Sequence, residues 1–216
     1  MSEADITRRS SMTLYCDHNC IQSHRAKIVL TEKAVTADIL HVRPDDMPES
    51  LLEANPYGNL PTLVDRDLMI NQVEIMCEYL DERFPHPPLL PVYPIARAKS
   101  RMMMGRIVRD WDPIVERLMK GGDDEEMQNA RTELYELLMT TLPVFSELPY
   151  FLSSEFSMVD CYIAPILWRL PSFGVELPKS ASAITDYMDR VFARETFKTC
   201  LSEIEMSIHE TILDEL

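Results

Sequence analysis

Short apolar runs and helical spacings of apolar residues alternate along the first 84 residues of the chain. The runs are rich in aliphatic and β-branched residues, which is typical of strands. The predicted strands are residues 12–16, 37–42, 61–65 and 68–70, and the predicted helices are residues 21–33 and 73–84. In the first helix we expect Ile21, Ile28 and Val29 on one side. The order β-α-β followed by β-β-α predicts an α/β domain of the thioredoxin-like type.

Strand patterns nearly disappear after residue 94, and helical spacings take their place. Residues 95–120 carry one long helical pattern, in which Pro113 should introduce a kink. Gly121-Gly122 should end that helix, because glycine readily adopts the conformation that follows a helix C-terminus.

Two capping signals mark the helices that follow. Asp123, with Glu126 three residues later, predicts a helix start, and Ser157 with Asp160 repeats the same logic. The second cap precedes an apolar run that reaches Leu170 and predicts a buried central helix. The second half of the chain is therefore predicted to be all-helical.

These patterns divide the chain into four segments. Residues 1–11 are a polar lead-in that we expect to be disordered, and residues 12–86 form the thioredoxin-like domain. Residues 87–94 are a proline-rich linker, and residues 95–216 form the helical domain.

Charge and composition exclude several classes of function. A formal net charge of -15 repels phosphate backbones, so we expect no direct nucleic-acid binding. The basic positions between Arg97 and Arg109 are interpreted as the exposed face of a helix. No apolar run is long enough for a membrane span or a signal peptide, and the five cysteines are an odd number without a secretion signal. The sequence thus predicts a cytoplasmic protein with reduced thiols and no membrane attachment.

The stretch Asn55-Pro-Tyr-Gly-Asn-Leu-Pro-Thr-Leu resembles the NPxGxxPTL loop of the glutathione S-transferase superfamily, which also joins a thioredoxin-like domain to a helical one. The resemblance implies a cis bond between Leu60 and Pro61 and a glutathione site beside it. Superfamily members hold glutathione with a Glu/Gln-Ser pair, and this chain has Gln72-Val73 at the matching place. A lost hydrogen bond to a charged group costs about 1.5–3 kcal/mol. We therefore expect Leu60, Pro61, Gln72 and Val73 to form a vestigial glutathione site.

Cys20 lies where thiol-type members of the superfamily keep a catalytic cysteine, although Ile21 replaces the proline that usually follows it. A glutathione-dependent thiol transferase that uses Cys20 is the alternative function, since a helix N-terminus can lower the pKa of a thiol. Cys16, His18, Cys20 and His24 also suggest a zinc site, but they are spaced more tightly than known zinc knuckles. We predict no metal and no other cofactor.

Residues 78–97, with the element Phe84-Pro-His-Pro-Pro88, and residues 150–171 resemble the stringent starvation protein A family. This family is the bacterial, RNA-polymerase-associated branch of the superfamily. The resemblance implies a non-enzymatic homodimer, or a heterodimer with a paralogue. It also implies that the chain binds RNA polymerase holoenzyme and redirects transcription under stress.

The proline segment then becomes a candidate partner-binding surface, because prolines remove backbone freedom before a partner arrives. The predicted surface comprises Phe84, Pro85, His86, Pro87, Pro88, Tyr93 and Arg66. The alternative interpretation is that the prolines only end the preceding helix and fix the angle between the domains. Superfamily dimers meet along the long helix after the linker, which places Met102, Met103 and Arg106 in the predicted dimer interface.

Overall fold

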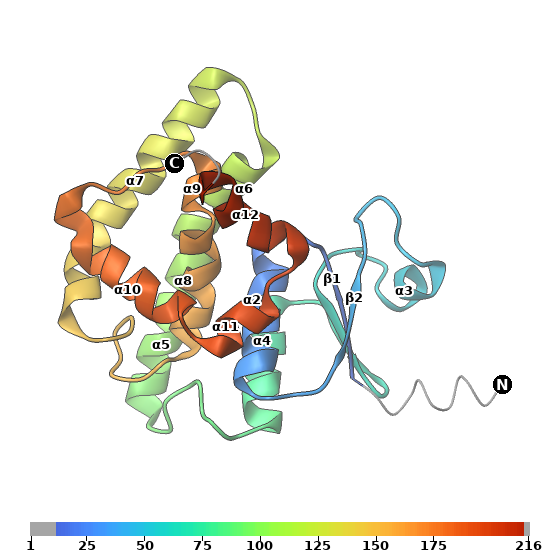
Figure 1. Ribbon diagram of the computed structural model, residues 1–216. Helices are drawn as coiled ribbons and strands as arrows, with labels where there is room; N and C mark the ends of the chain where they lie inside the picture. The colour runs from blue at the N-terminus through green and yellow to red at the C-terminus, as the bar shows by residue number, and fades with distance from the viewer. Residues whose placement is uncertain (1–11, 214–216) are drawn as a thin grey trace. The chain divides into compact units, whose positions relative to one another are not determined.

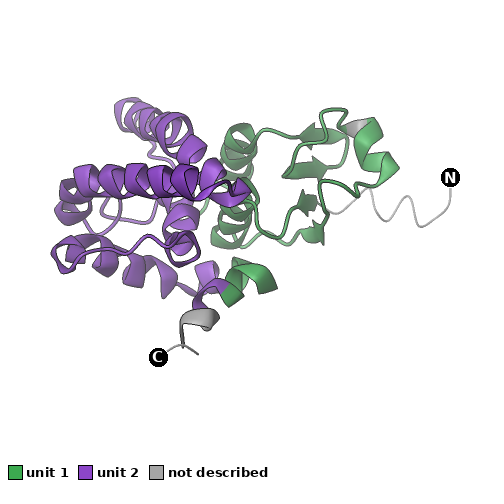
Figure 2. Ribbon diagram, turned by 90° about the horizontal axis from the view of Figure 1, so that it is seen from above, with its two compact units in different colours: residues 1–87, 199–207 green, residues 88–198, 208–216 purple. Residues whose placement is uncertain are grey.

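The computed structural model describes residues 12–213, and the predicted lead-in at residues 1–11 lies outside them. The chain forms two compact units (Figure 2). Unit 1 contains residues 1–87 and 199–207, and unit 2 contains residues 88–198 and 208–216. Unit 1 thus includes a segment near the C-terminus as well as the N-terminal part of the chain.

The sheet of unit 1 has the four strands that the sequence predicts. They are β1 (Thr13–Cys16), β2 (Asp38–His41), β3 (Thr62–Asp65) and β4 (Leu68–Ile70), in the order β2-β1-β3-β4. β1 pairs with β2 in parallel, with Thr13 opposite Asp38, and with β3 in antiparallel, with Thr13 opposite Val64. This is the predicted thioredoxin-like topology. β2 is an edge strand whose four residues are all exposed, so its alternating pattern does not correspond to a buried face.

Three helices accompany the sheet: α2 (Ile21–Glu32), α3 (Glu49–Ala54) and α4 (Val73–Arg83). α2 and α4 pack against each other on one face of the sheet (Figure 1). Ile21, Ile28 and Val29 of α2 are buried, as expected of its apolar side, but polar residues on its other sides are buried too. The Nζ atom of Lys27 lies 2.5 Å from Oε2 of Glu205, and Nδ1 of His24 lies 3.3 Å from Oε1 of the same carboxylate. Glu205 belongs to the C-terminal segment of unit 1, which therefore covers the polar side of α2.

Unit 2 is built from helices. Their bounds are α5 (Pro94–Arg106), η1 (Ile107–Trp111), α6 (Asp112–Lys120), α7 (Asp124–Glu147), α8 (Met158–Trp168), α9 (Leu170–Phe173), η2 (Lys179–Ala181) and α10 (Ser182–Phe192). Two further helices, α11 (Glu195–Cys200) and α12 (Glu203–Leu213), each contain residues of both units. The predicted helix at 95–120 is α5 and α6 joined by η1, a π-helical turn just before Pro113. A π-helical turn and a proline are both recognised causes of a kink. Pro113 has no N–H with which to donate the usual backbone hydrogen bond. Gly121 follows α6 with φ of 73°, which confirms the predicted helix end.

Both predicted caps are present. Oδ1 of Asp123 accepts from the backbone N–H of Glu126 at 2.9 Å, and Ser157 with Asp160 forms a capping box at the start of α8. α8 is buried along nearly its whole length, as predicted, but it ends at Trp168 and α9 begins at Leu170. α5 and α10 pack against α8. Within residues 12–213, no helix combines the length and the apolar character that a membrane crossing needs.

Candidate functional site

The proline segment follows α4 directly. Phe84 ends that helix by donating its backbone N–H to the carbonyl oxygen of Leu80 at 3.0 Å, and it is half-buried. The next four side chains, Pro85 to Pro88, are all exposed. The peptide bond between His86 and Pro87 is cis. The imidazole of His86 therefore lies among exposed proline rings on a short, irregular stretch of chain.

Hydrogen bonds hold the backbone at two points of this segment. In unit 1, the buried ammonium group of Lys33 donates to the carbonyl oxygen of Pro87 and lies 2.5 Å from Oδ1 of Asp81 in α4. In unit 2, the carbonyl oxygen of Leu89 accepts from the backbone N–H of Met158 at 2.8 Å. Leu89 is itself buried. The exposed side chains therefore project from a backbone that is fixed at Pro87 and again at Leu89.

A cavity of about 420 Å³ in unit 1 brings two of the predicted docking residues together. Its lining residues are Met12, Ala34, Val35, Thr36, Asp65, Arg66, Arg83 and Phe84. Arg66 occupies the turn between β3 and β4, where its φ of 60° lies in the left-handed region. Arg66 and Phe84 therefore line the same cavity.

The charges along this cavity are partly neutralised. Asp65 accepts a hydrogen bond from the hydroxyl of Tyr79 at 2.6 Å and another from Nε of Arg83 at 3.1 Å. These two bonds, the one from Tyr79 above all, hold the pKa of Asp65 below its usual value. The guanidinium of Arg83 also lies 5.7 Å from the ring centre of Phe84. Within the described part of the chain no ion pair involves Arg66, although its charge contributes to the lowered pKa of Asp65.

The other predicted docking residues do not line this cavity. Pro85, His86 and Pro87 belong to unit 1 and face solvent. Pro88 and Tyr93 belong to unit 2, where Tyr93 is 79% exposed and immediately precedes α5.

The residues of the predicted vestigial glutathione site lie in the loop before β3 and at the start of α4. The Leu60–Pro61 bond is cis, which confirms the prediction for that loop. Gln72 is the N-cap residue of α4, but its exposed side chain makes no capping hydrogen bond. Val73, the first helical residue, is buried and has no hydroxyl to donate to a carboxylate.

Cys20 is the N-cap residue of α2 and is half-buried. Its sulfur accepts from the backbone N–H of Ser23 at 3.5 Å and lies 3.1 Å from Oε1 of Gln22. The other four cysteines are buried, and all five are reduced. A reactive thiol in this chain is therefore best placed at position 20.

The predicted cluster of Cys16, His18, Cys20 and His24 is divided between different partners. The ring of His18 stacks on that of His41 with 4.0 Å between centroids, whereas His24 bonds to Glu205. Cys16 lies 3.5 Å from Nδ1 of His41, and burial raises the pKa of its thiol to about 12. Among residues 12–213 no three His, Cys, Asp or Glu side chains are grouped as metal ligands. The position of His41 beside Cys16 was not predicted, because it follows from the register between β1 and β2, in which the two residues are opposite each other.

The predicted dimer residues lie on α5. Met102 is 75% exposed, Met103 is half-buried, and Arg106 is exposed with its Nε 3.5 Å from Oδ2 of Asp110. Met104, which follows them, is buried in unit 2.

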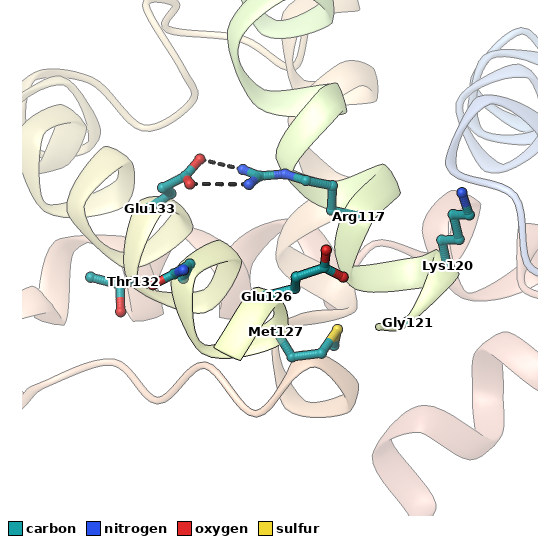
Figure 3. Close-up of a pocket in the computed structure, with 8 residues that line it drawn as sticks. Arg117, Lys120, Gly121, Glu126, Met127, Thr132 and Glu133 are labelled. Carbon is teal, nitrogen blue, oxygen red and sulfur yellow. Dashed lines mark hydrogen bonds and ion pairs between the residues drawn. The ribbon is translucent and has the colours of Figure 1, made fainter. Parts of the chain in front are cut away.

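A further cavity, of about 570 Å³, lies between α6 and α7 (Figure 3). Arg117 crosses it and binds the carboxylate of Glu133 with both ends of its guanidinium fork, one of them at 3.1 Å. These opposite charges neutralise each other, and the pKa of Arg117 is raised by the bond to Glu133. No motif in the sequence marks this cavity, and its central cation already has a partner.

Comparison with known proteins agrees with this fold. A family model described as glutathione S-transferase, N-terminal domain, matches residues 14–88, and one described as glutathione S-transferase, C-terminal domain, matches residues 96–195. The stringent starvation protein A homolog of Pasteurella multocida is 48% identical over 96% of this chain and 97% of its own length. Glutathione S-transferase omega-2 of Rattus norvegicus is 27% identical over 75% of this chain and 66% of its own length. The crystal structure of glutathione transferase Omega 3C from Trametes versicolor superimposes with a TM-score of 0.78 and 25% identity, covering 93% of this chain and 94% of that one.

Proposed function

Because the chain belongs to the stringent starvation protein A family of the glutathione S-transferase superfamily, we propose that it is a non-enzymatic transcription regulator that binds RNA polymerase holoenzyme. The response that it serves is starvation or stress. The contact surface is the Pro/His surface, defined as Phe84, Pro85, His86, Pro87, Pro88, Tyr93 and Arg66.

One observation supports this proposal above the others: Pro85 to Pro88 are exposed, yet the backbone of the segment is held by a hydrogen bond within each unit. Lys33 holds the carbonyl of Pro87, and the N–H of Met158 holds that of Leu89. Association costs free energy for ordering the loops of an interface, and about 0.5–1.5 kcal/mol more for each flexible side chain that is immobilised. A segment that is already ordered avoids much of this cost, which favours binding of a large partner.

The chemistry of the surface suits a protein partner. Proline rings and Phe84 offer apolar area, His86 offers a hydrogen-bonding tip, and Arg66 offers a positive charge at the adjacent cavity. Arginine and aromatic residues are enriched among the residues that dominate protein interfaces.

The glutathione site argues against a transferase. Gln72 and Val73 supply no hydroxyl for the γ-glutamyl carboxylate, and Glu74 adds a negative charge in the first turn of α4. The loss of one charged hydrogen bond weakens binding about tenfold to a hundredfold.

We also propose that the protein acts in the cytoplasm as a homodimer or as a heterodimer with a paralogue. Met102, Met103 and Arg106 of α5 would form the interface. Exposed methionine adapts easily to a facing surface.

Binding of purified RNA polymerase holoenzyme to the immobilised full chain tests the proposed surface. His86→Ala/Pro87→Ala should weaken the complex about tenfold or more, the effect expected of a central interface residue. Pro44→Ala changes another exposed proline of unit 1 and should leave binding unchanged. Equal retention of polymerase by the wild type and the double variant would remove the Pro/His surface from the proposal.

A glutathione-dependent thiol transferase is the second candidate, because Cys20 caps a helix N-terminus and is the least buried cysteine. Its test is turnover of a glutathione mixed disulfide by the wild type and by Cys20→Ser. Turnover that disappears with Cys20→Ser would support this candidate, and absence of turnover in the wild type would exclude it.

A further inference from the structure

A second cavity in unit 2, of about 320 Å³, lies where four elements meet: the start of α5, the end of α7, the loop that follows α7, and the start of α8. Its lining includes Lys99, Glu147, Leu148, Phe151 and Leu152. None of the seven residues of the Pro/His surface lines it. The volume is at the lower end of that of sites for small ligands and anchoring side chains.

Leu152 is the unusual residue of this cavity. Tyr150 and Ser153 pair through two backbone hydrogen bonds of 3.0 and 3.2 Å, and Leu152 occupies the tight turn between them with φ of 58°. Glycine or asparagine is the common choice at such a position, because a side chain there is strained. The leucine is also 44% exposed, so the isolated protein gains little from burying it.

The turn is held in this conformation from inside the unit. Phe151, the residue before Leu152, is buried, and its backbone N–H donates to Oδ1 of Asp160 at 2.9 Å. Asp160 is in turn part of the capping box of α8. A strained, exposed apolar residue on a rigid support is typical of a functional position.

Charge indicates what approaches this cavity. α5 contains the cations Arg97, Lys99, Arg101 and Arg106 and no acidic residue, in a chain whose net charge is -15, and the cavity lining itself contains Glu147 at the end of α7. Lys99 lines the cavity, and no ion pair is formed by its ammonium group within the described residues. Ile95, one turn before Lys99 on α5, is 76% exposed. An acidic partner with an apolar face complements this combination better than a nucleic acid, which would gain nothing from Leu152 or Ile95.

We propose that this cavity docks an acidic amphipathic segment of a partner protein. An apolar side chain of the segment enters beside Leu148 and Leu152, and a carboxylate of the segment pairs with Lys99. This helix-in-groove type of recognition needs one apolar anchor and a charged flank. The site is separate from the Pro/His surface and does not depend on the identity of the polymerase partner.

The test uses the full chain and a fluorescein-labelled synthetic helical peptide of about 14 residues, with leucine on one face and glutamate on the other. Two comparison probes carry the same dye: the same peptide with lysine in place of glutamate, and a short DNA duplex. We expect saturable binding of the glutamate peptide, measured by fluorescence anisotropy. The lysine peptide and the duplex should bind at least about tenfold more weakly.

Leu152→Gly should weaken binding of the glutamate peptide about tenfold, and Lys99→Gln should weaken it by a smaller factor. Glycine suits the left-handed position, so the Leu152→Gly variant should unfold at the same temperature as the wild type or a higher one. Leu68→Ala and Lys120→Gln change an exposed leucine and an exposed lysine elsewhere and should have no effect.

Three results would overturn the proposal. The first is equal binding of the glutamate and lysine peptides, or binding of neither. The second is binding of the DNA duplex as tightly as the glutamate peptide. The third is a halved solution mass of Leu152→Gly by light scattering, which would assign the cavity to a second copy of this chain.

Discussion

Replacement of Lys33 by methionine tests the link between the core of unit 1 and the Pro/His surface. Lys33 is buried, pairs with Asp81 at 2.5 Å and donates to the carbonyl of Pro87. Methionine keeps the length of the side chain and removes its charge and its donors. The carboxylate of Asp81 and the carbonyl of Pro87 then lose a shared partner.

The expected cost follows from burial. Removal of one partner from a buried ion pair costs about 3–5 kcal/mol, because the remaining buried charge loses its counterion. Lys33→Met/Asp81→Asn removes both charges and should cost less than the sum of the single changes, with a coupling of about 1–3 kcal/mol. For a urea slope of about 2–3 kcal/mol per molar, the single change lowers the midpoint of unit 1 by about 1–2.5 M.

The assay can distinguish the two units. Cys77 is fully buried in unit 1, so its labelling by a thiol reagent at increasing urea concentration reports the opening of that unit. Trp111 and Trp168 both belong to unit 2, and their fluorescence serves as the internal control. We expect the Cys77 midpoint to fall while the tryptophan midpoint changes less. An unchanged Cys77 midpoint, or a double variant that costs the full sum, would refute the assigned role of Lys33.

Three further predictions concern other parts of the chain. Asp160→Ala removes a helix cap and the acceptor of four hydrogen bonds, so unit 2 should lose about 3 kcal/mol or more, measured by urea unfolding with tryptophan fluorescence. The pKa of His41 is lowered from 6.5, first by partial desolvation of its ring and then by His18, so the unfolded chain binds its proton more readily. Stability should therefore fall as the pH decreases from about 6.5 toward the folded pKa, and His41→Gln should reduce this slope in thermal unfolding followed by circular dichroism. Gly105→Ala, in a helix with open space around it, should stabilise the protein by about 0.5–1 kcal/mol, whereas Gly121→Ala, at φ of 73°, should destabilise it by a similar amount. Thermal unfolding of the two alanine variants with the same sign of shift would contradict this backbone argument.

Local patterns were sufficient to predict most of the fold. The four strands, the cap at Asp123 and the capping box at Ser157 depend on residues within a few positions of one another, and all are present. α3 was not predicted, because its six residues are too few to show a helical period and its N-cap residue, Pro48, makes no side-chain cap.

Long-range polar contacts were not predictable in the same way. Lys27 belongs to what looks like a polar helix face, and the carboxylate that buries it, Glu205, is 178 residues away in the sequence. A single sequence contains no period or motif that joins two such positions. The burial of α2 on nearly all sides was missed for this reason.

The candidate site combines both kinds of information. The prolines and His86 are conspicuous in the sequence, but the group that fixes them, Lys33, lies 54 positions before its acceptor and binds a backbone carbonyl, which has no sequence signature. Proline limits the conformations of the free chain, and the buried lysine selects one of them in the folded protein. If the Pro/His surface binds a partner, Lys33→Met should therefore weaken that binding even under conditions in which unit 1 remains folded. A variant that is folded and binds polymerase as tightly as the wild type would show that the prolines alone provide the rigidity.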